Sequence, residues 1–171
     1  MELRDKSPVF IVDDDSLYLK VLKHKLSNDS TIDVRIFEKG ESCIENLKMN
    51  PEIVLLDYNL NSDNPRAKSG LEVLQEIKAV SPQTKVVMVS GYDNIDYVVN
   101  SFKLGASDYI LKNALAPGKI QTAIHRLINK IHHDSEERSY HNGVKLMLMI
   151  TGAIFAASVI IQVFFPRLFD K

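Results

Sequence analysis

Three consecutive carboxylates follow the first apolar run of the sequence. Asp13, Asp14 and Asp15 come directly after "VFIV", Val9–Val12, which has the length and composition of a short buried strand. Neighbouring carboxylates repel one another, so they either stay in water, as at a solvated helix start, or are held together by a cation. Grouped oxygen ligands suit Mg²⁺, which typically takes one or two carboxylates together with phosphate oxygens.

Polar side chains also close three later apolar runs. Asp57 follows "IVLL", Ser90 follows "VVMV" and Lys112 follows "YIL". The carboxyl ends of parallel strands share one edge of a sheet, which is where α/β proteins bind ligands. A further carboxylate at this edge could attack a phosphoryl group and form an aspartyl phosphate. A metal ion, an ammonium and a hydroxyl would stabilise the charge of the transferring group.

The elements that would position these side chains alternate regularly along the chain. This alternation is the pattern of a parallel sheet covered by helices, so we predict an α/β fold with a doubly wound, five-stranded parallel sheet. The expected strands are Val9–Val12, Thr31–Phe37, Ile53–Leu56, Val86–Val89 and Tyr109–Leu111. The expected helices are Ser16–Leu26, Glu41–Met49, Leu71–Val80, Ile95–Leu104 and Ile120–Ile131.

The composition limits the classes of function. The chain has 171 residues, 45% of them hydrophobic, and a formal net charge of -1, so it can form a packed core and has no basic excess for binding nucleic acid. Its one cysteine, Cys43, cannot form an internal disulfide, which fits a reducing compartment, and we expect it to be a small buried hydrophobe. The N-terminus lacks the apolar core of a signal peptide, so we expect the folded part in the cytoplasm.

The chain from about residue 7 to 131 resembles the receiver domain of the response-regulator family of two-component signal transduction. Four pieces carry the resemblance: "IVDDDS", "IVLLDYNL", "VVMVSGYD" and "GASDYILK". Each piece alone is weak, but together, at these spacings, they are highly specific. The resemblance implies a flavodoxin-like fold of receiver type.

The resemblance also implies roles for individual residues. Asp13 and Asp14 match the acidic pair that binds Mg²⁺, Asp57 matches the phosphoacceptor and a metal ligand, and Asn59 matches the position whose backbone carbonyl completes the metal site. Ser90 matches the hydroxyl that moves toward the phosphoryl oxygens, Lys112 the lysine that pairs with them, and Tyr109 the aromatic switch residue. Asp15 falls outside the acidic pair, and we expect it to face solvent or to cap the next helix.

Three features depart from the family pattern. Asn113 stands where the family usually has a proline in a cis bond, and because a cis bond before Asn costs about 3 kcal/mol we expect a trans bond or a differently shaped loop. The loop after Asp57 is five residues longer than usual, within 61–69, and would shield the site, contact a partner or be a mobile insertion. Tyr92, two residues after Ser90, would lie near the path of attacking water and slow the loss of a phosphoryl group.

The C-terminal part differs from the rest in hydropathy. Residues 132–145 are expected to be a charged linker or a helical extension, and 166–171 a short tail. The 20 residues 146–165 are uncharged and, as a helix of ~30 Å, would cross a bilayer. We therefore predict a single-pass C-terminal anchor with the receiver domain, 1–131, on the cytoplasmic face of the membrane. The alternative is a hydrophobic helix that packs in a protein interface.

The sequence thus predicts a phospho-acceptor signalling module that is no enzyme beyond its own phosphorylation and dephosphorylation. Its expected partners are a histidine kinase or phosphotransfer protein as donor, a downstream protein or a second copy of the chain, and a membrane, but no nucleic acid; no output domain is expected after residue 131. One alternative is a non-phosphorylated membrane adaptor with a receiver fold. A Mg²⁺-dependent phosphohydrolase ranks last, because such enzymes carry an acid/base aspartate where this chain has Asn59.

Overall fold

The sheet places the carboxyl ends of five strands along one edge. The structure, a computed structural model, describes the backbone of residues 6–60 and 67–164, and their side chains except those of residues 136, 138, 142 and 155–164. The strands are β1 (Ser7–Val12), β2 (Ile32–Phe37), β3 (Ile53–Asp57), β4 (Lys85–Ser90) and β5 (Asp108–Leu111), all parallel in the order β2-β1-β3-β4-β5. The predicted five-stranded parallel α/β fold is confirmed.

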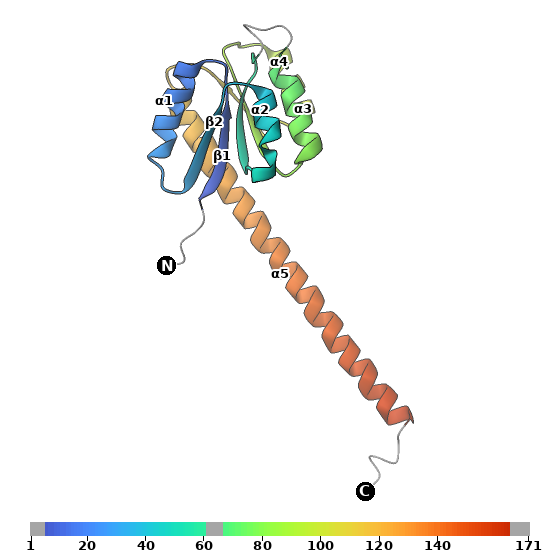
Figure 1. Ribbon diagram of the computed structural model, residues 1–171. Helices are drawn as coiled ribbons and strands as arrows, with labels where there is room; N and C mark the ends of the chain where they lie inside the picture. Colours follow the sequence, from blue (N-terminus) through green and yellow to red (C-terminus); the bar gives the residue numbers. More distant parts are fainter. Residues whose placement is uncertain (1–5, 61–66, 165–171) are drawn as a thin grey trace. The chain divides into compact units, whose positions relative to one another are not determined.

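Helices cover both faces of this sheet (Figure 1). They are α1 (Ser16–Ser27), α2 (Gly40–Glu45), α3 (Gly70–Val80), α4 (Ile95–Lys103) and α5 (Ala116–Phe164), with a 3₁₀ helix, η1, at Leu47–Met49. Asp15 caps α1, since its Oδ1 accepts hydrogen bonds from the backbone N–H groups of Leu17 and Tyr18 at 2.9 and 3.1 Å. The expectation that Asp15 caps this helix is therefore confirmed.

Alternate residues of the central strands pack on opposite faces of the sheet, as the period of two requires. Phe10, Val54 and Val86 are buried in a core with Leu74 and Ile77 of α3. The next residue of each of these strands, which points to the other face, is also buried: Ile11, Leu55 and Val87. On that face, residues of α1 and of the first turns of α5 are buried too: Leu19, Leu22, Leu26, Ile120 and Ile124. The central strands are buried on both sides, so their ends are held rigidly.

Cys43 is part of the first core, as expected of a small buried hydrophobe. Its side chain is fully buried, and burial raises the pKa of its thiol to about 12. The thiol is therefore protonated at neutral pH and unreactive.

The segment expected as one helix from Glu41 to Met49 is divided in two. The Asn46 side chain donates a hydrogen bond to the Ser42 carbonyl at 2.8 Å, the acceptor that the Asn46 backbone N–H would use in an α-helix. That N–H instead donates to the Cys43 carbonyl at 3.1 Å, so the chain tightens into the 3₁₀ turn of η1.

Helix α5 begins at Ala116 and continues without a break through the expected linker, 132–145. The chain divides into two compact units, Met1–Ile128 and Asn129–Lys171. The domain limits expected at residues 131, 145 and 165 stay predictions, and the tail at 166–171 lies outside the described residues.

The prediction of a membrane anchor is corrected. Within the part of the chain that the structure describes, no helix is both long enough and apolar enough to cross a membrane. Of the expected span 146–165, the backbone is described as helix up to Phe164 and the side chains up to Ile154. The expected location on the cytoplasmic face of a membrane is therefore wrong.

Candidate functional site

A lysine from one strand end lies between aspartates from two others. The Nζ of Lys112, just after β5, is 2.7 Å from Asp13 Oδ2, just after β1, and 2.9 Å from Asp57 Oδ1, the last residue of β3. Both aspartates are almost fully buried, with 2% and 4% of their surface exposed. A buried carboxylate requires a partner, and Lys112 serves both.

Asp14 completes an acidic cluster with Asp13 and Asp57. One carboxylate oxygen of each lies within 4.8 Å of the others. The backbone N–H of Asn59 donates to Asp57 Oδ2 at 3.2 Å, and the backbone N–H of Asp15 donates to Asp13 Oδ1 at 3.0 Å, so local turns hold two of the three carboxylates. The Lys112 ammonium contacts two of these three carboxylates, so the cluster keeps an excess of negative charge. Oxygen ligands with this excess fit Mg²⁺.

Burial and mutual repulsion change the protonation of these groups. Burial, and then the charge of Asp57, raise the pKa of Asp13 to about 6. Burial also raises the pKa of Asp57, against the opposing charge of Lys112. Burial by itself lowers the pKa of Lys112, but its hydrogen bonds and charge contacts with Asp13 and Asp57 outweigh this and raise it. The lysine therefore stays charged, and the carboxylates gain from a bound cation.

Ser90 lies on β4, the strand next to that of Asp57, and Tyr109 lies on β5, the strand beyond it. Ser90 ends β4, is fully buried, and accepts a hydrogen bond at its Oγ from the backbone N–H of Tyr92 at 3.1 Å. The hydroxyl of Tyr109, on β5, donates to the Tyr92 carbonyl at 3.0 Å. The β4–α4 loop is thus held through the backbone N–H and the backbone carbonyl of one residue, Tyr92. The structure brings Asp13, Asp14, Asp57 and Lys112 close together, and Ser90 and Tyr109 contact the adjoining β4–α4 loop through Tyr92.

Asn113 does not prevent Lys112 from reaching the site. The peptide bond between them is trans, one of the two outcomes expected from the sequence. The Lys112 backbone N–H donates to the Ser90 carbonyl at 2.7 Å, and Asn113 Oδ1 accepts from the Leu115 N–H at 3.0 Å. Lys112 is therefore held by the sheet, and Asn113 closes a turn that leads into α5. Most of the long loop, 61–66, lies outside the described residues.

Tyr18 is a site residue that sequence reasoning missed. It lies in the first turn of α1, and its ring centroid is 4.9 Å from Lys112 Nζ. Its hydroxyl is buried and has no hydrogen-bond partner among the described residues. No motif marks it, because an aromatic residue near the start of a helix more often belongs to the core. A second aromatic contact, the stack of Tyr58 on Tyr97 with centroids 4.5 Å apart, joins the end of β3 to α4.

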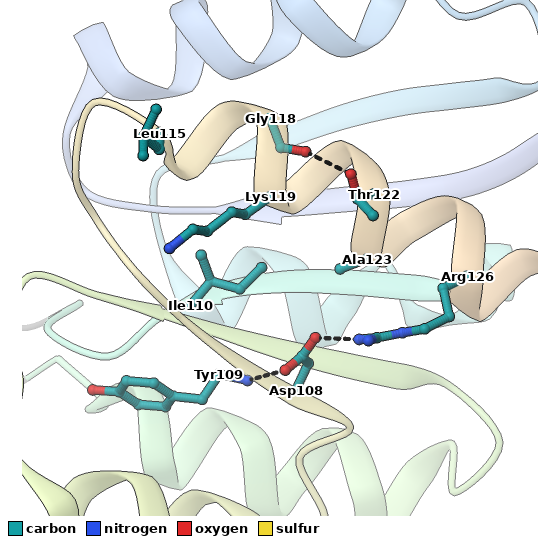
Figure 2. Close-up of a pocket in the computed structure, with 9 residues that line it drawn as sticks. All are labelled: Asp108, Tyr109, Ile110, Leu115, Gly118, Lys119, Thr122, Ala123 and Arg126. Carbon is teal, nitrogen blue, oxygen red and sulfur yellow. Dashed lines mark hydrogen bonds and ion pairs between the residues drawn. The ribbon is translucent and has the colours of Figure 1, made fainter.

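The surface beside Tyr109 is hollowed between β5 and the first turns of α5 (Figure 2). The hollow has a volume of about 640 Å³, and Ile110, Lys119 and Ala123 are among its lining residues. An ion pair between Arg126 and Asp108 closes one side, and the ring of Tyr109 extends away from α5. Tyr109 therefore connects the loop at the carboxylate cluster to an open outer face.

Comparison with known proteins gives a consistent result. Residues 9–125 match the family model described as the response regulator receiver domain. The chain is 31% identical over 119 residues to the transcriptional regulatory protein DegU of Brevibacillus brevis, covering 68% of this chain and 48% of DegU. It is 30% identical over 106 residues to the chemotaxis protein CheY of Listeria monocytogenes, covering 60% of this chain and 83% of CheY.

A solved structure agrees with these matches. The CheY-like receiver domain protein of Methanospirillum hungatei superposes with a TM-score of 0.65 at 26% identity, covering 76% of this chain and 99% of that one. The chain spans about half the length of DegU. The shared part is the sheet with its helices, which carries the carboxylate cluster.

Proposed function

Because this chain belongs to the response regulator receiver domain family, we propose that it accepts a phosphoryl group on Asp57 from a histidine kinase or a histidine phosphotransfer protein. The observation that carries the proposal is the Lys112 ammonium between Asp13 and Asp57, at 2.7 and 2.9 Å, beside a third carboxylate, Asp14. Charge of both signs converges where a phosphoryl group would be received. Receiver domains are signalling modules, so the protein phosphorylated on Asp57 would be the signalling state.

In the proposed reaction an oxygen of Asp57 forms a bond to the phosphorus of a phosphohistidine. The bond between phosphorus and the imidazole nitrogen breaks, and its electron pair returns to the imidazole. The 3.2 Å hydrogen bond from the Asn59 N–H holds one oxygen of Asp57 and leaves the other facing Lys112. Lys112 would then move its ammonium onto a phosphoryl oxygen, where it offsets the transferred charge.

The proposed metal ligands are Asp13, Asp14, Asp57 and the backbone carbonyl of Asn59. A bound Mg²⁺ would neutralise the carboxylates and the phosphoryl oxygens, which lowers the barrier to bringing two anions together. We propose Ser90 as the hydroxyl that contacts the phosphoryl group. Its Oγ is held by the Tyr92 N–H, so this contact would move the β4–α4 loop and release the Tyr109 hydroxyl from the Tyr92 carbonyl. Tyr109 is then the switch residue, and partner proteins would bind the outer face formed by β5 and α5.

Labelling of the full chain by acetyl phosphate, a small phosphoryl donor, in the presence of Mg²⁺ tests this proposal. Intact-mass spectrometry should show one added phosphoryl group in the parent protein and none after removal of Mg²⁺ by a chelator. Asp57→Asn should not be labelled, whereas Asp15→Asn, which keeps an oxygen to cap α1, should be labelled like the parent. Absence of labelling in the parent would favour a receiver-like adaptor that works without phosphorylation.

A further inference from the structure

We propose that Tyr18 is a positioning residue for phosphorylation, whose ring holds the Lys112 ammonium between Asp13 and Asp57. The contact is the 4.9 Å approach of Lys112 Nζ to the ring centroid. A cation over the face of a tyrosine ring is attracted by the ring's quadrupole, and the attraction grows when water is excluded. This inference rests on the proposed function and assigns it one more residue.

The geometry around the ammonium shows what the ring adds. A lysine ammonium has three N–H groups, and two of its contacts are Asp13 Oδ2 and Asp57 Oδ1. The ring of Tyr18 covers a third direction. Only 22% of the Lys112 side chain is exposed, so the ring stands where water would otherwise surround the charge. A lysine side chain has many rotamers, and confining it before the reaction removes a cost from the transition state.

The position of Tyr18 is itself fixed. Its backbone N–H is one of the two that Asp15 Oδ1 accepts, at 3.1 Å, and Leu19 beside it is almost fully buried. The segment from Asp13 to Tyr18 therefore provides a carboxylate for Lys112, a cap for the helix and a ring for Lys112 within six residues. The sheet holds the Lys112 backbone, and the Tyr18 ring adds a restraint on its long side chain beside the two carboxylates.

The surroundings of the Tyr18 hydroxyl indicate that the ring, and not the phenolic oxygen, positions Lys112. This hydroxyl is buried without a hydrogen-bond partner among the described residues. A buried unpaired hydroxyl costs stability, so its removal should not weaken the site. Phenylalanine keeps the ring and leucine does not, so the two substitutions separate the ring from the hydroxyl.

The test is the rate at which acetyl phosphate and Mg²⁺ label Asp57 in the full chain. We expect Tyr18→Leu to be about 5- to 30-fold slower than the parent, the range that a partly desolvated cation–ring contact implies. Tyr18→Phe should keep the parent rate, and so should Leu17→Ala, which truncates a side chain that is 71% exposed in the same turn. In NMR spectra the ring-current shift of the Lys112 ε-methylene should persist in Tyr18→Phe and vanish in Tyr18→Leu.

A double-substitution experiment distinguishes positioning from general loss of structure. If Tyr18 acts through Lys112, Tyr18→Leu should cause no further slowing in a Lys112→Ala background. An equal slowing in both backgrounds, a Tyr18→Leu rate equal to the parent rate, or a Tyr18→Phe rate as low as that of Tyr18→Leu would each overturn the inference while the proposed function stands. A parent protein that is never labelled would overturn both.

Discussion

Gly70 packs directly against the backbone of Asp57. A Cβ atom added at Gly70 would lie 2.1 Å from the Asp57 carbonyl oxygen, and the Gly70 N–H donates to the Tyr58 carbonyl at 3.1 Å. The first residue of α3 is therefore in contact with the residue that we propose as phosphoacceptor. The loop after Asp57 must return the chain to this point whatever its length.

Gly70→Ala should destabilise the protein and disturb the site. The added methyl group meets backbone atoms, which cannot rotate away, and overpacking of this kind costs about 1–3 kcal/mol. Chemical denaturation of the parent and the variant would measure the loss. Gly118→Ala is the matched control, because a Cβ there meets no atom within 4 Å and the position lies in α5. The control should be as stable as the parent or slightly more stable.

Lys112→Met should separate metal binding from phosphorylation. Methionine keeps the apolar stem but leaves Asp13 and Asp57 without their cation, so the three carboxylates repel more strongly. We expect tighter Mg²⁺ binding in calorimetry and much slower labelling by acetyl phosphate. Weaker Mg²⁺ binding than in the parent would mean that the lysine organises the metal ligands and does not compete with the metal.

Mg²⁺ affinity should fall as the pH falls through about 6. Burial and the Asp57 charge raise the pKa of Asp13 from 3.8 to about 6, so protons compete with the metal for this carboxylate in that range. Without metal, Asp13 binds a proton more tightly in the folded state than in the unfolded state. The charged carboxylate therefore lowers the free energy of unfolding above pH 6, and this loss fades as the pH falls toward 4.

Two measurements check this pH dependence. Calorimetry at pH 7.5 and 5.5 should show weaker Mg²⁺ binding at the lower pH. In metal-free buffer, Asp13→Asn should raise the melting temperature more at pH 7.5 than at pH 5. A melting-temperature difference that does not change with pH would contradict the raised pKa.

Tyr92→Ala should lose a phosphoryl group faster than the parent. The Tyr92 side chain is 55% exposed, and its ring meets the Tyr97 ring edge-on at a centroid distance of 6.3 Å. A large ring held here, two residues after Ser90, would restrict the approach of water to Asp57. The decay of phosphorylated protein after removal of the donor measures this effect, and a decay at the parent rate would remove Tyr92 from the account.

The sheet and the carboxylate cluster were predictable because both follow from local sequence. Strands such as Ile53–Leu56 are uninterrupted apolar runs, and a polar residue directly after each run must lie at the sheet edge. The contact of Tyr18 with Lys112 was not predictable, because it depends on how α1 is placed against the end of β5. The break at Asn46 depends on the hydrogen bond of one side chain. The membrane prediction relied on hydropathy alone, which the described part of α5 does not support.

The central claim is that Asp57 and Lys112 form a working phosphorylation site, and beryllofluoride, which mimics an aspartyl phosphate, tests it most directly. NMR spectra of the chain with Mg²⁺ and beryllofluoride should show saturable shifts of the Lys112 amide and the Tyr109 ring, which vanish without Mg²⁺ and in Asp57→Ala. Unchanged spectra at millimolar Mg²⁺, or shifts that persist in Asp57→Ala, would contradict the claim.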